Sequence, residues 1–228
     1  MNAYEAVAKE YYDPGLHPTC AALRDLSLQA VNACVLKLPT QGVLVEIGAG
    51  DSILAPIALK GEALHRVVLL DGSETMLTYS QKWGQMGAKL QRSDASETSL
   101  QSSSAALVIA SLGDPYNTPS FWDEMRRVLR PDGRLVFTSP AHEWSSRFRL
   151  GGKDDVAEFV TSNGKKFEMP SFVYPYKEQL ELIGRSGLSC REYFALTVSS
   201  LSGRTPPKLS LLSNDTPAVA CYDLVLRE

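Results

Sequence analysis

The feature that most constrains this chain is a series of short apolar runs separated by segments of helical character. Residues 43–47, 67–70, 107–110 and 134–138 form four such runs, and residues 89–93 are the expected strand between the second and the third. Continuous rather than alternating apolarity is typical of strands that are covered on both faces, as in a parallel sheet. Strands that alternate with helices predict a doubly wound α/β fold.

Helical periodicity and breaker residues predict the connecting elements. Apolar residues recur at steps of three and four before Pro39, and Ser73 is the expected N-cap of the helix that follows the second strand. The expected helices cover residues 19–38, 73–83, 119–129 and 176–185. Two β-rich stretches, 190–200 and 217–227, complete a mostly parallel, seven-stranded sheet, on whose edge we expect them to form an antiparallel hairpin.

Composition excludes several classes of protein. The 228 residues, of which 44% are hydrophobic and 21% charged, suit a single globular domain, and the formal charge of −3 gives no bulk attraction to nucleic acid. No apolar run reaches the ~20 residues of a membrane span, and the first residues lack the basic start and apolar block of a signal peptide. These two observations predict a cytoplasmic protein. The four cysteines are widely separated and form no CxxC pair, so we expect reduced thiols and no metal site.

Three features occur where predicted strands end. Gly48-Ala49-Gly50 follows the first strand, Asp71 ends the second, and Asp94 ends the third. Ligands of open α/β sheets bind at the carboxyl ends of the strands, and a carboxylate there can accept hydrogen bonds from ribose hydroxyls. Ile53 stands where a dinucleotide fingerprint needs glycine or alanine, which disfavours a pyrophosphate cofactor.

In the order and spacing of these motifs, most of residues 40–140 resembles the class I S-adenosylmethionine-dependent methyltransferases. Residues 43–50 look like their glycine motif, 70–77 like the block after it, 93–95 like the adenine-contacting segment, and 127–135 like the helix, turn and fifth strand. Ser52 replaces a glycine that many members have, and Ala106 replaces an acid. The resemblance implies the Rossmann-like methyltransferase fold, over residues 1–228 as one domain, and S-adenosylmethionine as the cofactor.

The resemblance also implies roles for individual residues. Gly48, Ala49 and Gly50 would pass under the methionine part of the cofactor, which Glu46 would orient. Asp71 would bind the ribose, and Asp94 and the Ala95 amide would bind adenine, against which Met76 would pack, unless Met76 only packs its own helix. The remaining expected cofactor contacts are Tyr11 of an N-terminal lid (1–40), Gly72, and Ser111 and Leu112 near the methyl group.

Methyl transfer needs a general base only if the acceptor carries a proton at neutral pH. His142, which follows the fifth strand, and His17, which lies in the lid, are the candidate bases, and a positioning role for each stays open. If the acceptor is already unprotonated, holding it in line with the methyl group supplies much of the effect. The segment after the fifth strand lacks the acid pair of metal-dependent members, so we expect no metal.

Acceptor-binding residues are expected on three segments. Tyr12 belongs to the lid, and Asp114 and Tyr116 belong to a segment that is similar to the Asp-Pro-Pro-Tyr element of amino methyltransferases but lacks its second proline. The aromatic, mildly basic insertion 141–175 contains Trp144 and Arg147 and either shapes the acceptor pocket or packs as a peripheral cap.

The function that these observations favour is methyl transfer to oxygen or nitrogen of a small organic acceptor, by a monomer or homodimer that does not bind membranes. Two alternatives stay open. One is a methyltransferase that modifies RNA or protein, although the acidic charge disfavours RNA. The other is a cofactor-binding subunit without catalytic activity.

Overall fold

The computed structural model describes residues 3–149, 153, 155–201, 203 and 205–227. The helices are α1 (Ala3–Tyr11), α2 (Pro18–Cys34), α3 (Leu54–Lys60), α4 (Glu74–Leu77), α5 (Gln81–Gln85), α6 (Pro119–Val128), α7 (His142–Ser145), α8 (Tyr176–Arg185) and α9 (Pro207–Ser210). Short 3-10 turns are η1 (Leu64–Arg66), η2 (Thr78–Ser80), η3 (Asp114–Tyr116), η4 (Ser146–Phe148) and η5 (Val198–Ser200). The strands are β1 (Val43–Ile47), β2 (Val67–Asp71), β3 (Lys89–Arg92), β4 (Ala105–Ala110), β5 (Leu129–Pro140), β6 (Val156–Val160), β7 (Lys166–Pro170), β8 (Leu188–Thr197) and β9 (Pro217–Leu226).

Seven of these strands form one sheet in the order β3-β2-β1-β4-β5-β9-β8, and β6 and β7 form a separate hairpin. β1 to β5 are parallel, whereas β9 is antiparallel to both of its neighbours, β5 and β8. The expected doubly wound, mostly parallel sheet with an antiparallel hairpin at its edge is therefore confirmed. The order within that hairpin was not predicted: β9, the last strand, lies inside, and β8 forms the edge.

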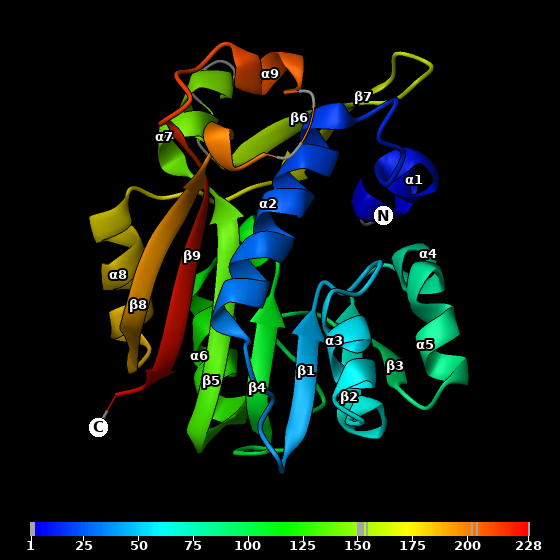
Figure 1. Cartoon of the computed structure of the whole chain (residues 1–228), viewed down its shortest axis with the longest axis vertical. Helices are drawn as coiled ribbons and strands as arrows, with labels where there is room; N and C mark the ends of the chain where they lie inside the picture. Colours follow the sequence, from blue (N-terminus) through cyan, green and yellow to red (C-terminus); the bar gives the residue numbers. More distant parts are fainter. Residues whose placement is uncertain (1–2, 150–152, 154, 202, 204, 228) are drawn as a thin grey trace.

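Helices cover both faces of the sheet (Figure 1). Along β1, Val45 and Ile47 face the cluster that contains α6 and α8, whereas Leu44 faces the cluster that contains α2 and α3. This alternation follows from the two-residue period of a strand. Both faces are buried, which explains the continuous apolarity of the strands. No helix among the described residues is long and apolar enough to cross a bilayer.

α2 is shorter than the pattern predicted. The helix ends at Cys34 rather than near Pro39, because Val35 adopts non-helical dihedral angles. Val35 and Leu38 pack into the cluster between α2, α3 and the sheet, while Leu36 is 87% exposed. Val35 and Leu38 are thus buried without a helix, although the spacing of apolar residues predicted that the helix continues to this point.

The predicted helix over 73–83 is divided into α4, η2 and α5. Ser73 is its N-cap, as predicted, and accepts a hydrogen bond from the amide of Met76. Ser80, at the break, donates to the carbonyl oxygen of Gly50 (2.6 Å) and accepts from the amide of Ser52 (3.3 Å). The interruption therefore lets a buried serine support the glycine turn after β1.

The N-terminal segment lies beyond the carboxyl ends of β1 and β2, where α1 packs between α4 and the β6–β7 hairpin (Figure 1). The carboxylate of Glu5 accepts hydrogen bonds from the hydroxyls of Ser73 and Thr75. The hydroxyl of Tyr79 donates to the carbonyl of Ala8 (2.7 Å). These bonds fix α1 over the sheet edge at which the parallel strands end.

Candidate functional site

A cavity of about 440 Å³ lies at this carboxyl edge of the sheet. The ends of β1, β2, β3 and β4 supply its floor, and α1, α2 and the end of β7 contribute to its cover. The residues expected from the sequence that line it are Tyr11, Tyr12, Glu46, Gly48, Ala49, Asp71, Gly72, Met76, Asp94, Ala95, Ser111, Leu112 and Tyr116. The expected residues that do not line it are His17, Gly50, Asp114, His142, Trp144 and Arg147.

The glycine turn after β1 is shaped by two left-handed residues. Gly48 and Gly50 have φ angles of 66° and 39°, which residues other than glycine rarely adopt. A Cβ atom on Gly48 would lie 2.9 Å from the hydroxyl oxygen of Tyr116, and one on Gly50 would collide with the hydroxyl of Tyr12. Both glycines are therefore required by backbone conformation and by these two tyrosines.

The same tyrosines are held by the backbone around that turn. The hydroxyl of Tyr116 donates to the carbonyl oxygen of Ile47 (2.9 Å), and the hydroxyl of Tyr12 accepts from the amide of Asp51 (2.9 Å). Tyr12 comes from the segment after α1, and Tyr116 comes from η3 after β4. Segments remote in sequence are thus fixed on either side of the glycine turn.

Asp71, at the end of β2, is oriented by two backbone amides. Its carboxylate oxygens accept from the amides of Gly50 (3.0 Å) and Ser73 (2.9 Å). Burial raises the pKa of this carboxyl group above its ordinary value. A carboxylate has about four acceptor sites, so the side chain keeps capacity for two hydroxyl donors from a ligand.

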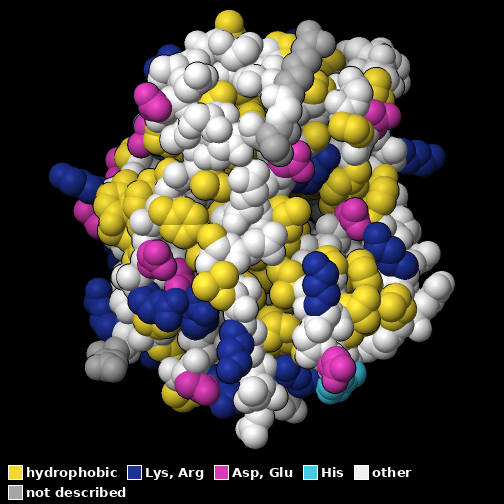
Figure 2. Space-filling model, in the orientation of Figure 1, with side chains coloured by type: hydrophobic (Ala, Val, Ile, Leu, Met, Phe, Trp, Pro, Cys, Tyr) yellow, Lys and Arg dark blue, Asp and Glu magenta, His cyan; other side chains and the backbone are white. Residues whose placement is uncertain are grey.

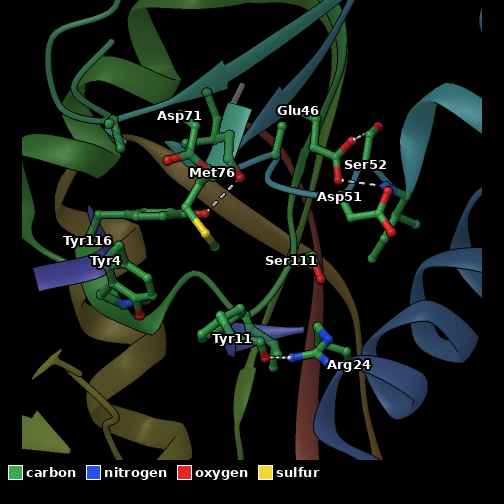
Figure 3. A pocket seen from close by; sticks show the side chains of 18 of the residues that line it. Tyr4, Tyr11, Arg24, Glu46, Asp51, Ser52, Asp71, Met76, Ser111 and Tyr116 are labelled. Atoms are coloured by element: carbon green, nitrogen blue, oxygen red, sulfur yellow. Dashed lines mark hydrogen bonds between the residues drawn. The ribbon is translucent and has the colours of Figure 1, made fainter. Parts of the chain in front are cut away.

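The end of β3 adds a second carboxylate. Asp94 and Ala95 line the cavity, and one oxygen of Asp94 accepts from the amide (2.8 Å) and hydroxyl (2.6 Å) of Ser96. Met76 lies near Asp71 at the same end of the cavity (Figure 3). This end of the cavity thus offers an apolar side chain and carboxylate acceptors to a ligand.

Glu46 has a structural partner in addition to its place on the cavity wall. Its carboxylate accepts from the hydroxyl of Ser52 and from the amides of Ile53 (3.0 Å) and Leu54 (3.0 Å). It therefore satisfies free amides at the start of α3. Burial raises the pKa of Glu46 to about 7.

The end of β4 carries backbone strain. Leu112 has a φ angle of 48°, which is uncommon for a residue with a branched side chain. Its amide donates to the hydroxyl oxygen of Thr138 (2.8 Å), whose side chain also bonds to Ser27 (2.6 Å). Ser27 in turn lies 2.6 Å from the hydroxyl of Ser111. This network from α2 and β5 holds Ser111 and Leu112 in place at the cavity wall.

Both histidines proposed as bases lie outside this cavity. The ring of His17 packs on Phe159 with 4.2 Å between the ring centres, and its Nε2 is 3.5 Å from the carboxylate of Glu10. His142 lines a different cavity of about 340 Å³, near Arg149 and Glu178. The order of the chain placed His142 at the right edge of the sheet, but α7 directs it away from the cavity.

Three expected acceptor-binding residues also have other surroundings. Trp144 is buried against α2 and β9, and Arg147 is exposed. The carboxylate of Asp114 accepts a hydrogen bond from the hydroxyl of Ser171, and its backbone carbonyl oxygen accepts one from the amide of Phe172 (2.8 Å). It thereby ties η3 to the end of the insertion, and burial raises its pKa to about 6.

The insertion 141–175 contributes Pro170 to the cavity wall. The aromatic and basic residues of the insertion are thus not the main lining of the cavity. Phe159 and Met169 of the hairpin instead form a small core with Val7, against which Tyr4 and Tyr11 pack. The hairpin of the insertion therefore packs against α1.

Sequence reasoning missed Tyr4 and Arg24. Tyr4 is seven residues before Tyr11, a helical spacing that places both on one face of α1, and their ring centres are 5.8 Å apart. That spacing was a usable signal. No sequence signal identifies Arg24, because its place in the cavity wall depends on how α2 packs.

Arg24 is the one Lys or Arg among the described lining residues. Its guanidinium donates to the carbonyl of Tyr11 (3.1 Å) and lies 4.7 Å from the ring centre of Tyr12. None of the ion pairs among the described residues includes it. Figure 3 shows Arg24 with Tyr11 at one end of the view and Asp71 with Met76 at the other.

Comparison with known families gives a direct match over the part of the chain that builds this floor. Residues 45–137 match a family described as "Methyltransferase domain". This part of the chain is thus a methyltransferase domain, and its motifs resemble those of the class I S-adenosylmethionine-dependent methyltransferases. The protein is accordingly an enzyme whose cofactor is S-adenosylmethionine. A comparison with curated protein sequences gives no match.

Solved structures resemble the methyltransferase in fold. An S-adenosylmethionine-dependent methyltransferase of Mesorhizobium loti is 18% identical, with a TM-score of 0.61 and coverage of 90% of this chain and 99% of the other. One of Clostridium acetobutylicum is 15% identical, with a TM-score of 0.63 and full coverage of both chains. A chain from the complex of the Haloferax volcanii Trm112 methyltransferase activator with a methyltransferase is 15% identical, with a TM-score of 0.69 and coverage of 100% and 99%.

The cavity of this methyltransferase fits its cofactor in charge as well as in place. S-adenosylmethionine carries a sulfonium, an ammonium and a carboxylate. The described lining residues supply one guanidinium, that of Arg24, and the carboxylates of Asp25, Glu46, Asp51, Asp71 and Asp94. An acidic cavity with a single cation complements a ligand with two positive groups and one negative group.

Proposed function

We propose that this methyltransferase transfers the methyl group of S-adenosylmethionine to oxygen or nitrogen of a small organic acceptor. When bound, the cofactor supplies an electrophilic methyl group on a sulfonium. The protein's contribution in this proposal is to bind both molecules in line, to exclude water, and to supply hydrogen bonds at fixed positions.

The observation that carries the proposal is the cover over the cavity. α1 is tied to α4 through Glu5 and to the β6–β7 hairpin through Glu10, whose carboxylate accepts from the amide of Ser162 (3.0 Å). The whole cavity, with a volume of about 440 Å³, is within the range of roughly 300–1,000 Å³ that small-molecule sites have. A cavity of this size, which α1 covers on one side, suits a small acceptor better than a folded polymer.

The surface supports the same choice. On the face drawn in Figure 2, basic side chains are interspersed with acidic and hydrophobic ones, and the chain as a whole has a formal charge of −3. Proteins that bind nucleic acid commonly gather Lys and Arg on one face. We therefore place RNA behind a small molecule as the acceptor.

We place the cofactor along the floor of the cavity. Asp71 would bind the ribose hydroxyls, and Asp94, Ala95 and Met76 would surround the adenine. Arg24 would pair with the carboxylate of the methionine part, because it is the cation that lines this cavity among the described residues. This assignment adds α2 to the binding site that the sequence motifs suggested.

We place the acceptor between the tyrosines and the end of β4. Tyr4, Tyr11 and Tyr116 line the cavity with Leu112 and Pro170. Burial raises the pKa of each of these tyrosines above its ordinary value, so all three hydroxyls stay protonated. The hydroxyl of Tyr116 already donates to the carbonyl of Ile47, so we assign the hydrogen bond to the acceptor to Tyr11. This wall suits a small aromatic or otherwise flat acceptor that carries a hydrogen-bond acceptor.

Neither His17 nor His142 lines the cavity, and no other His or any Lys does so among the described residues. The mechanism that we propose therefore uses positioning and desolvation rather than a histidine base. It favours an acceptor whose reacting atom is unprotonated near neutral pH.

Incubation with methyl-labelled S-adenosylmethionine and fractionated cell extract tests the proposal. We expect label in the small-molecule fraction, and loss of that label with the Asp71→Ala variant. Label in protein or RNA instead would overturn the choice of acceptor. Cofactor binding by calorimetry without transfer to any fraction would support a non-catalytic subunit and contradict the proposal.

A further inference from the structure

Two cysteines far apart in the sequence meet on one face of the sheet. The sulfur atoms of Cys34 and Cys221 are 3.7 Å apart, although 187 residues separate them in the chain. Cys34 is the last residue of α2, and Cys221 lies in the middle of β9, on which α2 packs. Figure 1 shows α2 crossing this face of the sheet.

The two thiols differ in exposure and acidity. Cys34 is half-buried, whereas Cys221 is fully buried. The hydrogen bond from the Cys221 thiol lowers the pKa of Cys34, and the same contact together with burial raises the pKa of Cys221. The accessible member of the pair is thus the one that forms a thiolate more readily, as an attacking cysteine must.

We propose that Cys34 and Cys221 are a redox modification site, at which a small-molecule disulfide oxidises the pair to an intramolecular disulfide that fastens α2 to β9. The inference is independent of the acceptor that the enzyme methylates. It rests on the pairing of an accessible and a buried thiol across two elements.

The reaction proceeds by two exchanges. The Cys34 thiolate attacks one sulfur of the oxidant, which forms a mixed disulfide and releases one small thiolate. The Cys221 thiol then gives its proton to the small thiolate that the first step released, and its sulfur attacks the sulfur of Cys34, which releases the second small thiolate. The two protein thiols lose two electrons in total, and the oxidant disulfide gains them.

The geometry permits the bond. The sulfur atoms must approach from 3.7 Å to about 2.05 Å, the length of a disulfide bond. Cys34 is at the point where α2 ends, and Val35 has left the helical conformation. A small movement at this helix end can bring the sulfurs together without disturbing the ladder of β9.

The other cysteines have different surroundings. Cys190 is half-buried on β8, and its thiol donates to the carbonyl of Glu192 (3.2 Å). Cys20 packs with Val7, Phe159 and the lid tyrosines. Among the described residues, Cys34 and Cys221 form the sulfur–sulfur contact that the structure records.

Such a disulfide would act on the wall of the cofactor cavity. α2 carries Arg24, which is ten residues, or roughly 15 Å, from Cys34 along the helix. The bond would not touch the reacting groups. It would fix the helix that presents Arg24 and Ser27 to the site.

Peptide mapping of the native chain tests the proposal. The folded protein is incubated with oxidised glutathione, free thiols are blocked with N-ethylmaleimide, and the non-reduced digest is examined by mass spectrometry. We expect a linked pair of peptides that contains Cys34 and Cys221, two hydrogens lighter than the separate peptides and lost on reduction with dithiothreitol. Two blocked free thiols, or a glutathione that stays on Cys34, would overturn the proposal.

Matched variants add a second measurement. Oxidation should raise the melting temperature of the native chain by roughly 5–10 °C, as expected for a bond that closes a long loop. Cys34→Ser should abolish the link and this rise, whereas Cys190→Ser should keep both. A rise that persists in Cys34→Ser would assign the stabilisation to another site and contradict the inference.

Discussion

Asp71 illustrates how the fold can orient a side chain for which we propose a role in ligand binding. Two backbone amides, from Gly50 and Ser73, hold its carboxylate at the end of β2. The amides fix the direction of the group before any ligand arrives, which lowers the entropic cost of binding. The same amides couple the glycine turn after β1 to the start of α4.

Replacing Asp71 should therefore weaken cofactor binding. For Asp71→Ala we expect a loss of ~2–4 kcal/mol, or roughly 30- to 1,000-fold in Kd, because a carboxylate that accepts two hydroxyls is removed. Calorimetric titration with S-adenosylhomocysteine measures it. Asp123→Asn, on the exposed face of α6, is the control and should bind normally; unchanged affinity of Asp71→Ala would remove the ribose assignment.

Arg24 allows a test that separates the two ends of the cofactor. Arg24→Met should weaken binding of S-adenosylhomocysteine by ~1–2 kcal/mol, roughly 5- to 30-fold, since the partly exposed guanidinium would lose a carboxylate partner. Methylthioadenosine lacks that carboxylate and should bind the variant and the parent protein equally. Lys60→Met, at the exposed end of α3, serves as the charge control. Equal losses for both ligands would contradict the pairing.

His142→Ala should change turnover by less than about threefold. A general base contributes roughly 100- to 10,000-fold, but His142 lines a cavity separate from the one that holds the cofactor motifs. The measurement is kcat with an acceptor found by labelled transfer, at several pH values. A loss of 100-fold with unchanged cofactor affinity would restore His142 as a base.

At the scale of single elements, α1 contributes most to the cover of the site. Three of the lining tyrosines, Tyr4, Tyr11 and Tyr12, come from α1 or directly follow it. Glu5 binds this helix to the start of α4, the segment that also carries Met76. A ligand that enters or leaves the covered cavity must displace this helix or pass beside it.

Glu5→Gln should loosen α1. The hydroxyls of Ser73 and Thr75 hold the pKa of Glu5 below its ordinary value, so the bonds favour the ionised carboxylate that glutamine lacks. We expect several-fold faster dissociation of S-adenosylhomocysteine in stopped-flow measurements and earlier proteolysis within residues 3–17. Glu74→Gln, exposed on α4, is the matched control. Identical dissociation rates for the two variants would show that α1 does not limit release.

The whole molecule carries buried acids whose ionisation opposes folding. Burial raises the pKa of Glu46 to about 7 and that of Asp114 to about 6. Since the unfolded chain ionises these groups at lower pH, the folded state holds more protons between about pH 4 and 7. The free energy of unfolding should therefore fall as the pH rises through this window.

Glu46→Gln isolates the contribution of Glu46. The free energy of unfolding is measured by urea denaturation at pH 5, 6 and 7. Between pH 5 and 7 it should fall further in the native chain than in the variant, by on the order of 2–3 kcal/mol. Glu181→Gln, exposed on α8, should follow the native chain. If the free energy of unfolding depends on pH in the same way in Glu46→Gln and in the native chain, Glu46 is ionised in the folded and in the unfolded state.

The sequence by itself determined the sheet and the floor of the site. Apolar runs and breaker residues are local properties, and the carboxyl ends of parallel strands must meet at one edge. The positions of Gly48, Asp71 and Asp94 at that edge therefore follow from the sequence. The family motifs occupy the same segments. The resemblance that these motifs carry implied S-adenosylmethionine as the cofactor.

Only the tertiary structure decided the cover of the site and its neighbours. The face that a helix presents depends on how it packs against remote segments, which is why Arg24 lines the cavity and His142 does not. The insertion of β9 between β5 and β8, and the meeting of Cys34 with Cys221, likewise depend on contacts between segments that are remote in the chain. Periodicity fixes which side chains share a face, but long-range packing selects what that face touches.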